Sequence, residues 1–353
     1  FKSVCAAVDK VSERSPMQSL LTSVLVAMRE GKPNVRALVP SLMAYAKALE
    51  FDAKWELAVD VYHTLLAHLH PVENSDAGAA AHLRLGSCYR NLHCTAEATA
   101  AYGAAMSIAV AVGDMDGVLR ARIGEAAMAS LRGNLPEAAS ILDIALTSAH
   151  GPELRDVRAT ALGERSAVAI LSGQYELGIR LAYSALVEMQ SSTDRDRVLN
   201  NIATAFSRLG VYSAARDAYL VLSATAQEQY MRWTATLNLL DVASMSGSEV
   251  LFEGYRRQLA GAPLVPQLQT NYEVMLGEGY RRFGQVDKAR RHLERAVDLA
   301  GRHNLNQLLI EAEEALARAD TIAPPPQAEV SSTLEVQEVA RALQQMRVAA
   351  GIS

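Results

Sequence analysis

The sequence predicts an all-α protein, a right-handed α-solenoid of about eight helix-turn-helix units, and three observations lead to this fold class. Half of the 353 residues are apolar but only 5% are aromatic, and the prevalence of alanine and leucine favours helix over sheet. A single core rarely grows to this length without splitting or repeating. A position that is mostly occupied by a small residue also recurs in steps of 36 to 40 residues, and a period of this length is typical of a solenoid. Its positions are Ala6, Ala46, Gly86, Ala126, Ser166, Ala203, Leu239 and Gly277.

Each unit is expected to consist of a first helix, a tight turn and a second helix. A second small residue follows the first by twelve positions in most units, at Ala58, Ala98, Ala138, Gly178, Ala215 and Ala289. Glycine often lies between the two, where the left-handed end of a helix favours it. These turns carry Gly133-Asn134, Gly173-Gln174, Gly210-Val211 and Gly284-Gln285.

The stretch LGEGYRRFGQVDKARRHLERAVDLA shows why small residues are needed. Gly277 lies inside an otherwise strong helix, where glycine costs about 1 kcal/mol relative to alanine. A close crossing of two helices, at axis separations of roughly 8 Å, would offset this cost. Gly86 holds the same place in LGSCYRNLHCTAEATAAYGAA, whereas Leu239 predicts a wider hairpin in its unit.

The predicted domains are a solenoid over 1–320, a Pro-rich linker over 321–331 and a tail helix over 332–353. Ser332 and Glu335 have the spacing of a capping box. The apolar side of the tail helix either folds back as a final cap or occupies a groove of its own or a neighbouring chain. The units are expected near 1–31, 39–70, 79–112, 119–149, 159–190, 196–227, 232–262 and 270–302, followed by a capping helix at 304–319.

The motif Leu85-Gly86-x-x-Tyr89 with Ala98-x-x-x-Tyr102 resembles the tetratricopeptide repeat. The resemblance covers residues 1 to about 320. The period exceeds the usual 34 residues, so the chain is most similar to long-repeat members such as kinesin light chains and bacterial peptide-sensing regulators.

In that family the first helices line a concave groove, so the resemblance implies a set of groove residues. Asparagine amides there would hold the main chain of a peptide, and arginines would bind carboxylates in a bidentate manner. Hydrogen bonds within the wall are an equal alternative for the asparagines. The candidates are Lys47, Arg84, Arg120, Arg197, Asn200, Asn201, Arg208 and Arg281.

The predicted function is a non-enzymatic scaffold that binds a protein or peptide segment. Two alternatives stay open: a ligand-sensing domain of a larger regulator or ATPase polypeptide, and an adaptor that self-assembles through its tail helix. The chain starts at Phe1 without a methionine, which leads us to expect a longer product. The sequence leaves the oligomeric state open.

Catalytic, cofactor and metal sites are not predicted. His82 and Cys88 lie six residues apart on one helix, so their side chains point in different directions. The same holds for His63 and His68, which are five residues apart. The segment 113–117 lacks the later glutamate of a calcium loop. Phosphate-binding, dinucleotide-binding and nucleophile-elbow motifs are absent from the sequence.

Charge and cysteine usage set the expected surroundings. A net charge of −5 argues against nucleic-acid or membrane partners. The apolar stretches are shorter than the roughly 20 residues of a membrane span. Three cysteines, Cys5, Cys88 and Cys94, suit a reducing compartment such as the cytoplasm. The basic run from Arg281 to Arg295 contains acidic residues and is interpreted as a solvated face.

Overall fold

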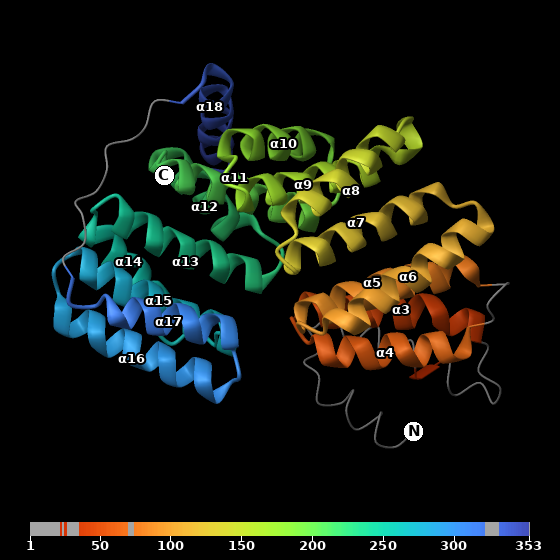
Figure 1. The fold of residues 1–353 in the computed structure, drawn as a ribbon, viewed down its shortest axis with the longest axis horizontal. Helices are drawn as coiled ribbons and strands as arrows, with labels where there is room; N and C mark the ends of the chain where they lie inside the picture. The colour runs from red at the N-terminus through yellow and green to blue at the C-terminus, as the bar shows by residue number, and fades with distance from the viewer. Residues whose placement is uncertain (1–21, 23–24, 27–34, 70–73, 322–331, 353) are drawn as a thin grey trace. The chain divides into compact units, whose positions relative to one another are not determined.

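The computed structural model describes residue 22 and residues 25–26, 35–69, 74–321 and 332–352. All regular elements in these ranges are helical (Figure 1), which confirms the all-α solenoid. Cys5 and the first predicted small residue, Ala6, lie outside the described residues. The elements are α3 (Val35–Phe51), α4 (Trp55–His68), α5 (Ser75–Asn91), α6 (Thr95–Val112), α7 (Met115–Leu131), α8 (Leu135–Ser148), η1 (Pro152–Leu154), α9 (Arg155–Leu171), α10 (Tyr175–Glu188), α11 (Ser192–Leu209), α12 (Tyr212–Thr225), α13 (Gln229–Met245), α14 (Glu249–Leu259), α15 (Pro266–Arg282), α16 (Val286–Arg302), α17 (Asn306–Ala317) and α18 (Leu334–Ala349).

The helices form two compact units, Phe1–Val168 and Ala169–Ser353. In both, consecutive helices form antiparallel hairpins, whose first members we call A helices and whose second members we call B helices. Neighbouring A helices also pack on one another, α5 on α7 in the first unit and α13 on α15 in the second. Each unit therefore has a layer of contacting A helices, as expected for a helical repeat.

The repeated glycines lie where an A helix meets its B helix. A β-carbon at Gly86 would lie 2.7 Å from the ring of Tyr102, and one at Gly277 would overlap the side chain of Leu293. Tyr102 and Leu293 both follow their glycine by sixteen residues. The same close approach thus occurs in two hairpins, and it confirms the packing explanation for these glycines.

Substitution of Gly277 by alanine is expected to destabilise the protein by about 1–3 kcal/mol, because overpacking outweighs the gain in helix propensity. Leu293 is fully buried, and the backbone oxygen of Ala289 would lie 3.2 Å from the added carbon, so little room exists for relaxation. Gly254 is the control, since a β-carbon there meets nothing within 4 Å. Gly254→Ala should stabilise slightly in denaturation followed by circular dichroism. Equal gains for both variants would contradict the close crossing.

The turns between A and B helices end in the left-handed conformation. Gly133, Gly173, Gly210 and Gly284 have φ values between 72° and 84°, as predicted from their positions. Residues other than glycine take the same conformation at Ala53, His93 and Asn304. His93 thus lies in the turn between α5 and α6.

The tail helix α18 packs against the B helices α10 and α12 of the second unit (Figure 1). Val336, Val339 and Leu343 are buried in this contact. Within its own chain α18 takes neither predicted location, because it lies on the B helices α10 and α12 and not beside the last A helix α17 or along the A helices. The groove of a neighbouring chain stays a prediction. The capping box is also wrong: the N-cap is Thr333 without a side-chain bond, and Glu335 pairs with Arg180 at 2.9 Å.

One helix of the described residues, α6, is long and apolar enough by length and composition to cross a membrane. Four of its alanines, Ala98, Ala101, Ala105 and Ala109, are buried, and α6 packs against α5 and α7.

Candidate functional site

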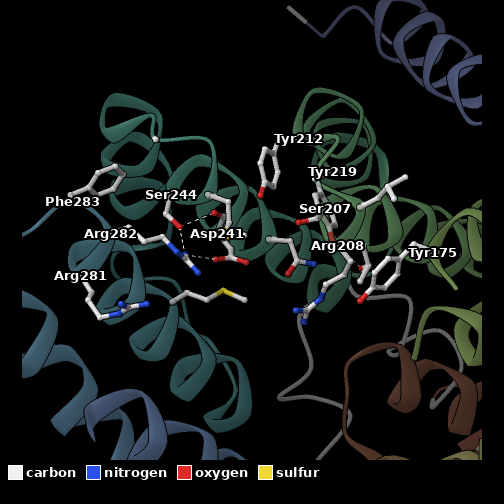
Figure 2. A pocket seen from close by; sticks show the side chains of 17 residues that line it. Tyr175, Ser207, Arg208, Tyr212, Tyr219, Asp241, Ser244, Arg281, Arg282 and Phe283 are labelled. Carbon is white, nitrogen blue, oxygen red and sulfur yellow. Dashed lines mark hydrogen bonds and ion pairs between the residues drawn. The ribbon is translucent and has the colours of Figure 1, made fainter. Parts of the chain in front are cut away.

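A pocket of about 750 Å³ opens in the second unit along its A helices (Figure 2). Residues from α11, α13 and α15 line it, together with Tyr175 at the start of α10 and with Tyr212 and Tyr219 of α12. Its size falls within the range of ligand-binding sites in proteins. Three basic side chains lie around it, namely Arg208, Arg281 and Arg282.

Two of the three arginines are held by carboxylates. Arg282 donates to Asp241 at 3.0 Å and to the hydroxyl of Ser244 at 2.5 Å. Arg281 forms an ion pair with Glu278 at 2.7 Å, and both side chains are largely buried. These two guanidinium groups are therefore fixed in position and largely neutralised before any ligand arrives.

Arg208 differs from them, because in the described residues its side chain forms no hydrogen bond or ion pair. It is exposed, and it extends into the open part of the pocket near Tyr175 (Figure 2). An unpaired guanidinium in a concave site is suited to bidentate binding of a carboxylate or phosphate. Arg208 is thus the residue of this pocket with the clearest capacity to bind an anionic group.

Neutral polar groups lie beside Arg208. The hydroxyl of Tyr219 is 3.0 Å from that of Thr204. Burial raises the pKa of Tyr219, against the opposing effects of the Thr204 hydrogen bond and of Arg208. The tyrosine therefore remains a neutral hydroxyl at physiological pH. The side-chain nitrogen of Asn238 contacts the side-chain oxygen of Asn200 at 3.4 Å, a long bond that leaves amide capacity for another partner.

The structure separates the predicted groove residues into three groups. Arg208 and Arg281 line the pocket, and Asn200 contacts its wall through Asn238. Arg197 pairs with Asp194 in the first turn of α11, and Asn201 is half-buried outside the pocket lining. Lys47, Arg84 and Arg120 belong to the first unit, where Lys47 is exposed.

Arg84 and Arg120 each connect neighbouring helices through hydrogen bonds to carboxylates. Arg84 donates to Glu50 through Nε at 3.0 Å and through Nη2 at 2.7 Å, and Tyr62 donates to the same carboxylate at 2.5 Å. Arg120 bridges Asp116 on its own helix and Asp156 on α9. Their charges are already compensated, so neither is a free ligand-binding group.

The sequence-based prediction missed Asn238, Asp241 and Ser244. These residues lie on α13. In the repeat that contains α13, Leu239 occupies the position that is usually a small residue, so this repeat looked atypical and no groove residues were predicted from it. A signal was present: Asn238 follows Asn200 by 38 residues, which is one repeat period. Comparing Asn200 with the equivalent position of the next repeat would therefore have identified Asn238 as a groove residue.

The predicted wide hairpin at Leu239 coincides with a separate cavity of about 240 Å³, lined by Leu239, Leu251 and Tyr255 among others. In the ranges that the structure describes, no group of three or more His, Cys, Asp or Glu side chains is placed to hold a metal. Cys88 and Cys94 are free thiols, and burial raises the pKa of Cys88 to about 12, so this thiol is unreactive.

Comparison with protein-family models and with curated proteins finds no match to this sequence. Solved structures are similar in fold. The apo form of the quorum sensor NprR from B. thuringiensis has a TM-score of 0.56 at 13% identity, covering 84% of this chain and 91% of that chain. NprR in complex with its cognate peptide NprX has a TM-score of 0.57 at 15% identity, covering 85% and 92%. A tetratricopeptide repeat protein from Parabacteroides merdae has a TM-score of 0.47 at 15% identity, covering 84% and 98%. The chain therefore shares the all-α helical-repeat fold of the two NprR structures.

Proposed function

We propose that the protein is a non-enzymatic peptide-binding solenoid and that the pocket around Arg208 is its binding site. The observation that carries this proposal is the position of Arg208, a guanidinium without a carboxylate partner in the described residues, at the edge of a 750 Å³ pocket. Arg208 would bind an acidic side chain or a terminal carboxylate of the peptide. Asn238 would hold the peptide main chain through its amide.

The similarity in fold to NprR, which has been solved with a cognate peptide, supports a peptide as the ligand class. The pocket itself supports it as well, because it combines an amide, hydroxyls and paired charges with Arg208, which has no partner among the described residues, around a concave surface. Arg281 and Arg282 are pre-oriented by Glu278 and Asp241. They would shape the pocket and not neutralise the ligand.

Charge reversal at Arg208 is expected to weaken peptide binding by about 10- to 100-fold, the value of one charge-assisted hydrogen-bonded contact. The test selects binders from a random eight-residue peptide library on the wild-type protein and measures them by fluorescence anisotropy against Arg208→Glu. Arg132→Glu, an exposed arginine of the first unit, is the matched control. Equal affinity of the Arg208 variant and wild type would exclude this pocket.

A regulatory role within a larger polypeptide is the second candidate, favoured by the similarity to a quorum sensor. It uses the same pocket, with an output domain on the same product. Intact-mass measurement of the native product tests it, because this role requires residues before Phe1. Self-assembly through the tail receives no support, since Val336, Val339 and Leu343 are buried within their own unit.

A further inference from the structure

A second polar pocket, of about 350 Å³, lies between the B helices α14 and α16, with Tyr280 of α15 among its lining residues. Its other residues are Glu253, Arg256, Lys288, Arg291, His292 and Arg295. Four cationic side chains thus surround one carboxylate in a protein whose net charge is −5. We propose that this pocket binds a small phosphorylated ligand that carries at least two negative charges.

The carboxylate of the pocket is already neutralised. Glu253 accepts hydrogen bonds from Arg256 at 2.6 Å and from the hydroxyl of Tyr280 at 2.8 Å. Burial opposes ionisation of Glu253, but these hydrogen bonds outweigh it and lower its pKa. The pKa of Tyr280 is raised to about 12 by burial and by Glu253. Glu253, Arg256 and Tyr280 therefore form a hydrogen-bonded group whose charges are already compensated.

The remaining cations of the pocket have no carboxylate partner among the described residues. The nitrogen of Lys288 lies 4.9 Å from the centre of the Tyr280 ring. Arg291 donates to the backbone oxygen of Asp287, and Arg295 forms no hydrogen bond or ion pair in the same ranges. His292 stacks on Tyr280 and contacts Glu273 at 2.6 Å. The uncompensated positive charge is thus concentrated on Lys288, Arg291 and Arg295.

This pattern differs from an ordinary solvated face. The arginines of α16 that point away from the pocket have acidic partners, Asp320 for Arg290 and Asp298 for Arg302. Asp320 is the main cause of the raised pKa of Arg290, with smaller contributions from Glu294 and Asp287. On α16, therefore, Arg291 and Arg295, which line the pocket, have no carboxylate partner among the described residues, whereas Arg290 and Arg302, which do not line it, are paired.

The ligand class follows from charge and size. Several cations around one cavity require an anion with more than one charge, and a phosphoryl group carries nearly two at neutral pH. Guanidinium groups match phosphate oxygens in geometry. A cavity near the lower end of the ligand-site range favours a small molecule. The face of Tyr280 is covered by Lys288 and His292, so the pocket lacks an open aromatic surface for a base.

The test uses calorimetric titration of the full chain at low salt with inorganic pyrophosphate as the probe. The double variant Arg291→Gln/Arg295→Gln should bind at least about tenfold more weakly than wild type. Arg132→Gln/Arg155→Gln removes the same charge from two exposed residues of the first unit and should change affinity by less than about twofold, since diffuse charge contributes little. Arg208→Glu should retain pyrophosphate binding, which separates this site from the peptide pocket.

Three outcomes would overturn the proposal: no binding of pyrophosphate to wild type, equal losses in the two double variants, or equal affinity for citrate. Equal affinity for citrate would show that this surface binds polyanions in general and does not select phosphoryl groups. Titrations with inorganic phosphate and with a sugar phosphate then identify the source of the group, because tighter binding of the sugar phosphate indicates an organic phosphate. Circular dichroism verifies that both double variants are folded.

Discussion

Replacing Arg347 with alanine is expected to release α18 from the second unit. Arg347 forms an ion pair with Asp217 at 3.0 Å, and the two side chains are only 18% and 11% exposed. Loss of one partner would leave the Asp217 carboxylate charged and buried, which typically costs about 3–5 kcal/mol. This cost arises only while α18 covers the Asp217 carboxylate. We therefore expect the helix to undock, because undocking returns the carboxylate to water.

Hydrogen exchange of the amides between Val336 and Leu343 measures the release directly. Arg341→Ala is the control, since Arg341 is exposed on the same helix and bonds only to the backbone of Gln337 in the described residues. Asp217→Leu with Arg347→Met should restore protection, because an apolar pair of similar volume removes both buried charges. Unchanged exchange in Arg347→Ala would show that the apolar contacts alone hold α18.

The docking of α18 also shows how far local sequence determines the fold. The apolar side of the tail, with Val336, Val339 and Leu343, is readable from its period, but such a stripe fits any complementary groove. In its docked position the helix pairs with Asp217, a residue more than a hundred positions earlier that has no local signature of pairing. The existence of the helix was therefore predictable from local sequence, whereas the surface it contacts was not.

The repeat fold was predictable because its main steric requirement is periodic. Gly86 and Gly277 occupy equivalent positions and face equivalent partners, Tyr102 and Leu293. Helix propensity alone would disfavour both glycines, so their recurrence identifies a crossing. The close approach at Gly124, where an added β-carbon would overlap the Tyr102 ring, was not predictable in the same way, because Gly124 lies outside the repeating register.

The pocket was only partly predictable, because sequence shows which residues lie on A helices but not which charges are already paired. Arg84 and Arg208 share the same residue type and the same kind of helix. Glu50 neutralises the first, whereas the second has no such partner in the ranges described. This difference depends on a neighbouring helix and thus requires coordinates.

Truncation of one side chain in the aromatic cluster between α14 and α15 should cause a large loss of stability. Phe252 is fully buried and makes edge contacts with Tyr280 and Phe283, each with ring centres 5.3 Å apart. Phe252→Ala is expected to lower the free energy of unfolding by about 3–5 kcal/mol through lost contacts and a cavity. Urea denaturation followed by circular dichroism gives this value.

Gly279 provides the means to show that the loss comes from this crossing. A β-carbon there would overlap the Phe252 ring, so Gly279→Ala alone should cost about 1–3 kcal/mol by overpacking. With Phe252→Leu in the same chain, the smaller side chain leaves room for the added methyl group, so the two costs should not add. An additive double variant would mean that Phe252 and Gly279 do not share this space. A less than additive loss would mean that α14 is positioned by the fit of one ring over one glycine, and with it the Glu253 and Arg256 side of the basic pocket.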